Sequence, residues 1–359
     1  MLLTTPADEL SVPKADPADS FVLHAPLEVM ARVGLLPFVD PARRDDALAM
    51  IDALGRQYAD AGAQVPEPAA VEVGDPAAAA AALLAAVRDG DLDQVDAYAA
   101  ALLPLLSARE AAGLLAEGVV TSLAAAGHAP IGFALLARVQ PTLPTTLLRG
   151  TLQNIARRPD WHVSWHLHVA GDGVAGRLHE ALRAAPFLGV PGSHFIHPLM
   201  SQVQDSGVAA DVLAPVLATR YDTVAAARTL SRIAAWSMVH DDPAVAPYGW
   251  SHALTMPQAV MSMAGAGVQP RTALAVAATF TLGFRAAYGS APLPAAIDAG
   301  SLPDASVTEI ATAAALHEDA HLVKYALACL HAADDDSSHR PLYLSAAARL
   351  VDLWGAWPA

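Results

Sequence analysis

The stretch His317-Glu-Asp-Ala-His321-Leu-Val-Lys324-Tyr-Ala-Leu-Ala-Cys-Leu-His331, near the C-terminus, decides how this chain is interpreted. If the stretch is one helix, His317, His321, Lys324 and His331 lie on one stripe of its surface. Leucine, valine and alanine side chains form a second, apolar stripe beside the first. Two adjacent inward stripes predict a deeply buried helix that carries imidazoles and one amine.

Glu318 and Asp319 fall on the remaining face of this helix, where we expect both carboxylates to point to water. For any single histidine in an apolar helix, a hydrogen-bonded core residue is the simpler interpretation. A buried lysine is harder to explain in this way, because its charge is costly to remove from water unless it is paired or neutralised. Three histidines on the stripe of Lys324 therefore favour a functional site.

The composition predicts closely packed helices, since 54% of the residues are hydrophobic and only 16% are charged. Helical periodicity recurs from Phe21 onward, strand-type alternation is nearly absent, and we expect an all-α fold with a dozen or more helices. Residues 1–20 are rich in Pro and Asp, and we expect a disordered or surface extension there. Residues 21–359 are predicted to form a single large, bundle-like domain.

The charge and the cysteine content limit the classes of binding partner and the cellular compartment that we expect. A formal net charge of −15 argues against binding to nucleic acid or to an anionic membrane. The single cysteine, Cys329, excludes an internal disulfide and a cysteine-rich zinc site. The first residues lack the pattern of a signal peptide, and the most apolar run, 77–87, is too short to span a membrane. We therefore expect a cytoplasmic protein, of an oligomeric state that the sequence leaves open.

Histidines also stand near the starts of other apolar helices, at His24, His128 and His252. Together with His321 and Lys324 they form a constellation drawn from distant parts of the chain. Imidazole nitrogens bind iron, zinc and copper well, and side chains from separate helices commonly converge inside a helical bundle. The sequence therefore suggests a metal site, although it does not show that these residues meet.

A rival metal site is His240-Asp-Asp242, because H-x-D with a distant histidine is the spacing of a two-histidine, one-carboxylate iron site. That motif usually sits on a β-scaffold, whereas here it follows a predicted helix and precedes a proline. We rank it second. The sequence leaves open the roles of the remaining histidines in the middle of the chain, namely His162, His166, His168, His194 and His197.

The run Gly171-Asp-Gly-Val-Ala-Gly176 satisfies G-x-G-x-x-G, the pattern of a dinucleotide-binding loop. No βαβ pattern surrounds the run, and no acidic residue stands about 20 residues further on. We expect an ordinary turn before a helix. The motif G-x-S-x-G and the P-loop are absent, so the sequence does not support the corresponding serine hydrolase or nucleotidase classes.

Four segments in order resemble the questin oxidase-like family of oxygenases: His24-Ala-Pro-Leu-Glu-Val-Met-Ala-Arg-Val-Gly34, His128-Ala-Pro-Ile-Gly-Phe-Ala, His252-Ala-Leu-Thr-Met-Pro-Gln-Ala and His317-Glu-Asp-Ala-His321-Leu-Val-Lys324. The resemblance extends from about Phe21 to the C-terminus. The chain departs from the family at Gly132, where a polar residue is usual, and in its alanine-rich middle, so the substrate is in doubt. The resemblance implies oxidative ring opening of an anthraquinone-type polyketide by dioxygen at a non-heme Fe(II), held by histidines and a lysine, with NADPH as a candidate electron donor.

Two roles for Lys324 remain open. Burial lowers the pKa of a lysine, and a neutral lysine can add carbon dioxide to become a carbamate, which supplies an anionic oxygen to a metal. Such a carbamylated lysine would help to balance the +2 charge of iron in an apolar pocket. Alternatively, Lys324 pairs as a cation with a buried acid or with a substrate phenolate.

The sequence therefore predicts an iron oxygenase with His24, His128, His252 and His321 as ligands and Lys324 as a fifth ligand or close neighbour. A small aromatic polyketide and O2 are the expected substrates, and Trp161, Trp165, Trp236 or Trp250 are candidates to stack on the aromatic ring. The alternatives are a zinc hydrolase, in which the metal lowers the pKa of bound water, and a helical polyketide-binding protein without catalysis. Metal content distinguishes the three.

Overall fold

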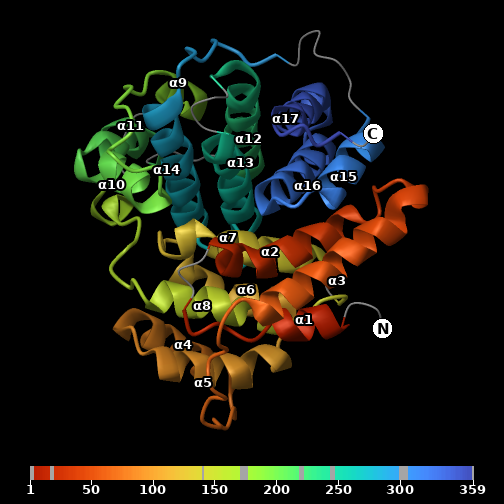
Figure 1. Ribbon diagram of the computed structural model, residues 1–359. Helices are drawn as coiled ribbons and strands as arrows, with labels where there is room; N and C mark the ends of the chain where they lie inside the picture. The colour runs from red at the N-terminus through yellow and green to blue at the C-terminus, as the bar shows by residue number, and fades with distance from the viewer. Residues whose placement is uncertain are drawn as a thin grey trace.

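The computed structural model describes residues 4–16, 20–139, 141–169, 177–217, 222–242, 247–298 and 306–357. Within these ranges the chain forms seventeen α-helices and short 3-10 turns, with no strand and three isolated bridge pairs. The helices form a single packed body (Figure 1). The prediction of an all-α fold is confirmed. Among the described residues, no helix has the length and apolar character needed to cross a membrane.

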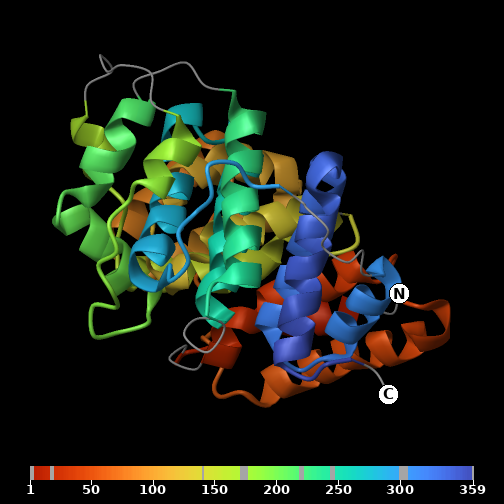
Figure 2. The ribbon, with the colours of Figure 1, turned by 90° about the horizontal axis from the view of Figure 1, so that it is seen from above.

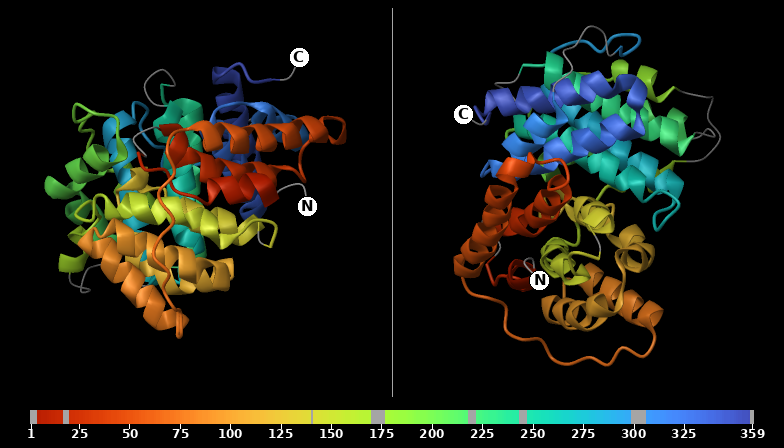
Figure 3. Two further views of the ribbon diagram at one scale, coloured as in Figure 1. Left: turned by 60° about the horizontal axis from the view of Figure 1, so that its bottom comes forward. Right: turned by 90° about the vertical axis from the view of Figure 1, so that its right-hand side faces the viewer.

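The first eight helices occupy the lower part of the molecule in Figure 1 and lie together in both views of Figure 3. They are α1 (Thr4–Leu10), α2 (Ser20–Leu35), α3 (Arg44–Asp60), α4 (Pro76–Asp89), α5 (Leu92–Leu102), α6 (Ala108–Val119), α7 (Ala129–Val139) and α8 (Arg149–Ala156).

The other nine helices form the upper part, where α12 and α17 lie side by side (Figure 2). They are α9 (Leu178–Arg183), α10 (Ile196–Asp205), α11 (Val208–Leu217), α12 (Thr223–His240), α13 (Pro247–Ser262), α14 (Pro270–Tyr288), α15 (Val307–Leu316), α16 (Ala320–Asp335) and α17 (Arg340–Leu353).

Helices begin and end where local chemistry predicts. Ser107 and Glu110 form a reciprocal capping box at the start of α6, which satisfies two backbone N–H groups that the helix itself leaves unpaired. Gly90 ends α4 with φ of 71°, a left-handed conformation that favours glycine. Gly127, with φ of 67°, precedes α7. Gly90, Ser107 and Gly127 thus mark boundaries between successive helices.

Two segments differ from expectation. The stretch 317–331 is not one helix, because α15 ends at Leu316 and α16 begins at Ala320, with Asp319 as its N-cap. Thr4–Leu10, within the expected surface extension, form α1, whose Ala7 and Leu10 are buried and which packs against α3. This part of residues 1–20 therefore belongs to the packed body.

Four helices form a closed ring where the lower and upper parts meet: α2 and α7 from below, α13 and α16 from above. Each helix in this ring packs against both of its neighbours. Helices α2 and α16 approach closely, because a Cβ atom added at Gly34 would lie 2.7 Å from Leu327 Cδ2. The four ring helices or their immediate starts carry His24, His128, His252 and His321.

A buried arginine on α2 forms hydrogen bonds to the break between α15 and α16. The Arg32 guanidinium donates to the carbonyl oxygens of Ala315 and His317, both at 2.6 Å, and pairs with Glu28 one turn earlier at 2.5 Å. Arg32 and Glu28 are both buried. Arg32 thereby satisfies two carbonyl groups that the end of α15 leaves without helical partners.

We expect Arg32→Met to lower the free energy of unfolding by about 3–5 kcal/mol, because the Glu28 carboxylate and two carbonyls would lose their buried partner. Urea unfolding followed by circular dichroism measures this change. The control is Arg43→Met, since Arg43 forms an exposed pair with Asp46 and its loss should change stability by no more than about 1 kcal/mol. Equal stability of the two variants would contradict the role given to Arg32.

Candidate metal centre

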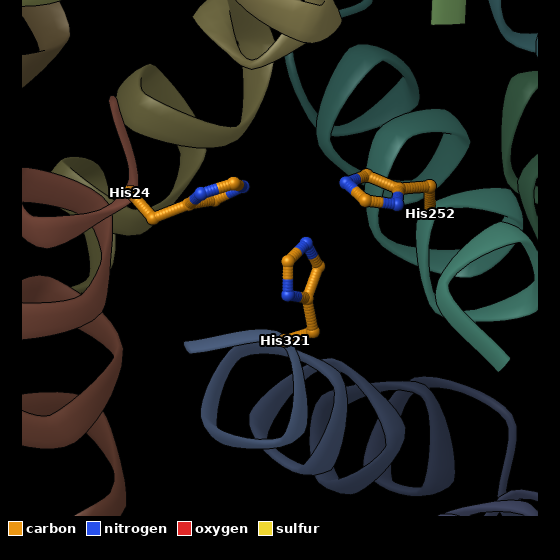
Figure 4. A group of neighbouring side chains, drawn as sticks. All are labelled: His24, His252 and His321. Carbon is orange, nitrogen blue, oxygen red and sulfur yellow. The ribbon is translucent and has the colours of Figure 1, made fainter. Parts of the chain in front are cut away.

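Three imidazoles from three helices meet in the middle of the ring. His24 projects from α2, His252 from α13 and His321 from α16, and the three rings point toward a common centre (Figure 4). One ligand nitrogen from each ring lies within 4.8 Å of the others. His24 and His252 are buried and His321 is nearly so. This group can hold a metal ion.

His128 lies beside this group, immediately before α7. Its ring centroid is 4.6 Å from that of His24 and 5.2 Å from that of His252. The Nε2 atoms of His128 and His252 are 3.3 Å apart. Two nitrogens bound to one tetrahedral metal at about 2.1 Å lie roughly 3.4 Å from each other, so this pair has the separation of shared ligands.

All four imidazoles use the other ring nitrogen, Nδ1, in the same way. In His24, His128 and His252, Nδ1 donates to the backbone carbonyls of Ser20, Ala125 and Tyr248 at 2.7, 2.8 and 2.6 Å. In His321, Nδ1 donates to the Asp319 carboxylate at 2.9 Å. These acceptors carry no hydrogen, so each Nδ1 holds the ring proton.

It follows that each neutral ring presents an unprotonated Nε2 lone pair. The Nε2 atom of His24 is buried and has no hydrogen-bond partner among the described residues. His128 and His252 direct two lone pairs at each other, which is unfavourable unless a cation or a proton lies between them. Ring orientation fixed through Nδ1, with Nε2 left for the ion, is the usual arrangement of metal-bound histidine.

The environment keeps these imidazoles neutral. Burial, and then the charge of Lys324, holds the pKa of His24 and of His128 well below the ordinary value of 6.5. Burial and the neighbouring His321 do the same to the pKa of His252. The pKa of His321 is also lowered by burial, although its bond to Asp319 opposes the shift. Neutral imidazole is the form that binds metals.

Lys324 reaches the centre from α16, one turn after His321. It is 3% exposed, and its Nζ lies 3.2 Å from Nε2 of His128. Burial lowers the pKa of Lys324 to about 7, against the opposing charges of Glu28 and Asp319. Near neutral pH a substantial fraction of this side chain is therefore an uncharged amine.

Asp319 is a site residue that the sequence analysis assigned to the solvent. Its carboxylate accepts from the backbone N–H of His321, which caps α16, and from the ring of the same histidine. The hydroxyl of Tyr248 donates to its second oxygen at 3.2 Å. Although burial acts in the opposite direction, the bonds to His321 lower the pKa of Asp319 to about 2. An aspartate directly before an apolar helix is an N-cap signal, and it was available in the sequence.

Glu28 is a second residue near the centre that the sequence analysis did not single out. It lies one turn after His24 on α2, is buried, and is paired with Arg32. Burial raises its pKa, while the charges of Arg32 and Lys324 act in the opposite direction. A lone glutamate one turn after a histidine, within an otherwise apolar run, was the signal for it.

Several expected residues lie elsewhere. His317 lies outside α16. Its Nδ1 accepts a hydrogen bond from the backbone N–H of Asp319, and its ring stacks on Trp354. His331 lines a cavity two turns along α16 from Lys324. In the rival motif, His240 is exposed, stacks on Trp236, and bonds the Trp236 carbonyl. Within the described residues, neither it nor Asp242 belongs to a group that can hold a metal.

The four tryptophans proposed to stack on a substrate pack against other groups. Trp161 stacks on His197, and Trp165 donates to Thr279. The third, Trp236, stacks on His240, while Trp250 meets the edge of Tyr288. None of these four lines the cavity next to Lys324.

The segment 161–168 is neither an α-helix nor a β-strand. Its last four residues, Trp165–His168, form a 3-10 turn, and His162 makes an isolated bridge to Ser122. The G-x-G-x-x-G run at 171–176 lies outside the described residues, so the turn expected there stays a prediction.

No family model, no curated protein and no solved structure matches this chain in comparisons with known proteins. The resemblance to the questin oxidase-like family therefore stays an inference from the four sequence segments.

If His24, His128, His252 and His321 share one ion, changing any one of them to Ala should lower metal occupancy at least tenfold. The controls are His179→Ala and His339→Ala, since these imidazoles bond the carbonyls of Pro294 and Ile297 far from the centre. Elemental analysis of protein purified without chelator measures the occupancy. Equal metal content in all six variants would contradict a shared site.

Proposed function

We propose that this protein is a metal-dependent oxygenase that attacks an electron-rich aromatic ring, such as that of an anthraquinone or anthrahydroquinone. The observation that carries the proposal is the convergence of unprotonated Nε2 atoms in a buried pocket, each ring oriented through Nδ1. Neutral imidazoles suit iron, zinc and copper alike, and the four-segment resemblance is the reason to propose Fe(II). The four-segment resemblance adds the reaction class.

In this proposal His24, His252 and His321 hold the ion, and His128 is the fourth ligand. When bound, Fe(II) supplies an open coordination position and electrons for reaction with O2. The protein supplies rigid ligands, because the four Nδ1 bonds fix each ring before the ion arrives. The apolar interior excludes bulk water from the centre, which limits unproductive reactions of a reactive group.

Lys324 has two candidate roles in the proposed reaction. As a carbamate formed with carbon dioxide, it would give the ion an anionic oxygen and offset part of its charge. As a cation, it would bind the phenolate of a substrate next to the metal. The lowered pKa of Lys324 favours the neutral amine from which a carbamate forms, and the 3.2 Å contact with His128 places the side chain at the centre for either role. NADPH as an electron donor belongs to the same proposal and rests on the family resemblance alone.

A zinc hydrolase is the second candidate, favoured by the three-histidine group itself. Three histidines with one open position are a common catalytic zinc arrangement, in which bound water is activated near neutral pH. A non-catalytic polyketide-binding protein is the third. The buried Nε2 atom of His24 argues against it, since a ligand-binding core would gain nothing from leaving this atom without a hydrogen-bond partner among the described residues.

Elemental analysis of protein purified without chelator should find about one iron per chain if the proposal holds, whereas zinc would favour the hydrolase and the absence of metal the binder. The iron-loaded protein should consume O2 when given a reduced anthraquinone, and the product should contain oxygen from ¹⁸O2. The matched control is His321→Ala, which removes a ligand. Iron at full occupancy without O2 uptake across a panel of hydroquinones would contradict the oxygenase assignment.

Lys324→Ala distinguishes the two roles of this residue. As a carbamate ligand, its loss should remove most of the metal, reconstitution of the metal-free wild type should depend on bicarbonate, and Lys324→Glu should recover part of the binding. As a substrate-binding cation, its loss should leave metal content unchanged and raise KM about tenfold or more, with no effect of bicarbonate. Metal content and KM both unchanged in Lys324→Ala would exclude both roles.

A further inference from the structure

A row of aromatic side chains connects the metal centre to the surface through α14, which packs along α13 (Figure 1). The ring of Phe284, on α14, lies nearly parallel to that of the proposed ligand His252, with 6.5 Å between their centroids. Tyr288, one turn further along α14, follows at 6.4 Å from Phe284. His194 ends the row at 5.9 Å from Tyr288 and is exposed to solvent.

The outer end of this row is a buried phenol bonded to an exposed imidazole. Tyr288 is 4% exposed, and its hydroxyl lies 3.0 Å from Nδ1 of His194. Burial raises the pKa of Tyr288, so the phenol keeps its proton at the pH of a cell. A neutral imidazole with its own proton on Nε2 accepts this hydrogen bond through Nδ1. Because His194 is exposed, a proton that it receives can pass on to water.

The bonded imidazole distinguishes Tyr288 from other buried tyrosines. Tyr58 donates to a backbone carbonyl, which is not a base. Tyr343 donates to the Asp336 carboxylate. Although burial acts in the opposite direction, hydrogen bonds from Arg232 and Tyr343 lower the pKa of Asp336 to about 2, so this carboxylate is a poor proton acceptor. An imidazole, with an ordinary pKa of about 6.5, is suited to take a proton near neutral pH.

Trp250 lies beside the row and lacks a proton acceptor. Its ring meets that of Tyr288 edge-on at 6.2 Å, and its buried Nε1–H has no hydrogen-bond partner among the described residues. The Arg285 guanidinium lies 5.8 Å from the centroid of the same ring. An indole that lost an electron here would carry a positive charge in an apolar core, next to a cation. Tyr288, which can release a proton to His194, is therefore the better electron donor.

We infer that Tyr288 and His194 form a redox-active pair, in which the phenol gives one electron to the metal centre and its proton to His194. The O–H bond of Tyr288 breaks and an N–H bond forms at Nδ1, which leaves a neutral tyrosyl radical and an imidazolium. The electron crosses the gap that the packed Phe284 ring occupies. The oxidant that gains it is the iron centre after reaction with O2 or peroxide, when no organic substrate is bound.

The pair returns to its first state with a reductant from solution. A thiol or ascorbate supplies one electron to the tyrosyl radical, and the imidazolium returns the proton. An oxidised centre without substrate otherwise reacts with the side chains around it, and a closed site needs a way to limit such side reactions. The inference rests on the proposed function for the oxidant, whereas the phenol and its proton acceptor belong to this end of α14 alone.

The test is electron paramagnetic resonance on iron-loaded protein that is mixed with hydrogen peroxide, without substrate, and then frozen. We expect a radical signal that narrows when the protein contains ring-deuterated tyrosine, which assigns the radical to a tyrosine. Tyr288→Phe should lower this signal at least tenfold, because it removes only the hydroxyl group. The matched control is Tyr343→Phe, a buried tyrosine bonded to a carboxylate, which should retain the signal.

A second variant tests the proton acceptor. His194→Ala should also lower the signal at least tenfold, and imidazole added to the buffer should restore part of it, because the exposed position is open to a small base. Circular dichroism checks that each variant folds. Loss of the signal without recovery would contradict the role of His194. An unchanged signal in either variant, or no tyrosyl signal in the iron-loaded wild type, would overturn the inference.

A metal-free experiment separates this inference from the proposed function. A ruthenium(III) complex, formed by a light flash in the presence of persulfate, serves there as the one-electron oxidant. We expect a tyrosyl signal, part of which disappears in both Tyr288→Phe and His194→Ala. A protein that binds no iron or consumes no O2 but shows this difference would contradict the proposed function and retain the pair. A flash-induced signal that is identical in the three proteins would contradict the pair itself.

Discussion

The burial of four imidazoles and one amine in an alanine-rich interior is the constraint on which the rest of this structure depends. Polar atoms removed from water must find partners, and here every Nδ1 finds an oxygen on or near its own helix. Among the described residues, the buried Nε2 atom of His24 has no partner, and that of His128 contacts Lys324 and His252. A bound cation is the natural partner for such a set, and it would satisfy them all at once.

A series of charged residues beside the centre connects α2 to α16. Arg32 donates hydrogen bonds to carbonyl oxygens at the end of α15, and Glu28 forms an ion pair with Arg32. The charge of Glu28 also acts to raise the pKa of Lys324. The same arginine therefore stabilises the break between α15 and α16 and pairs with the Glu28 carboxylate next to the site. The break itself brings Asp319 onto the ring of His321, so a detail of helix termination becomes part of the ligand support.

The centre has two different sides. On one side Tyr248, which is half exposed, contacts the edge of His321 and donates to Asp319. On the other side Lys324 lines a small cavity together with Arg138 and His331.

The sequence by itself determined the helical class, because helical periodicity acts over a few residues, and it singled out the four histidines and Lys324 as candidates. It did not determine that these side chains meet, since convergence depends on how α2, α7, α13 and α16 pack. It also misplaced His317 and Asp319 by extending one helix across a break. Only the tertiary structure decides which polar atoms lack partners, because that depends on neighbours far apart in the chain, and here it brings together three imidazoles that could hold a metal ion.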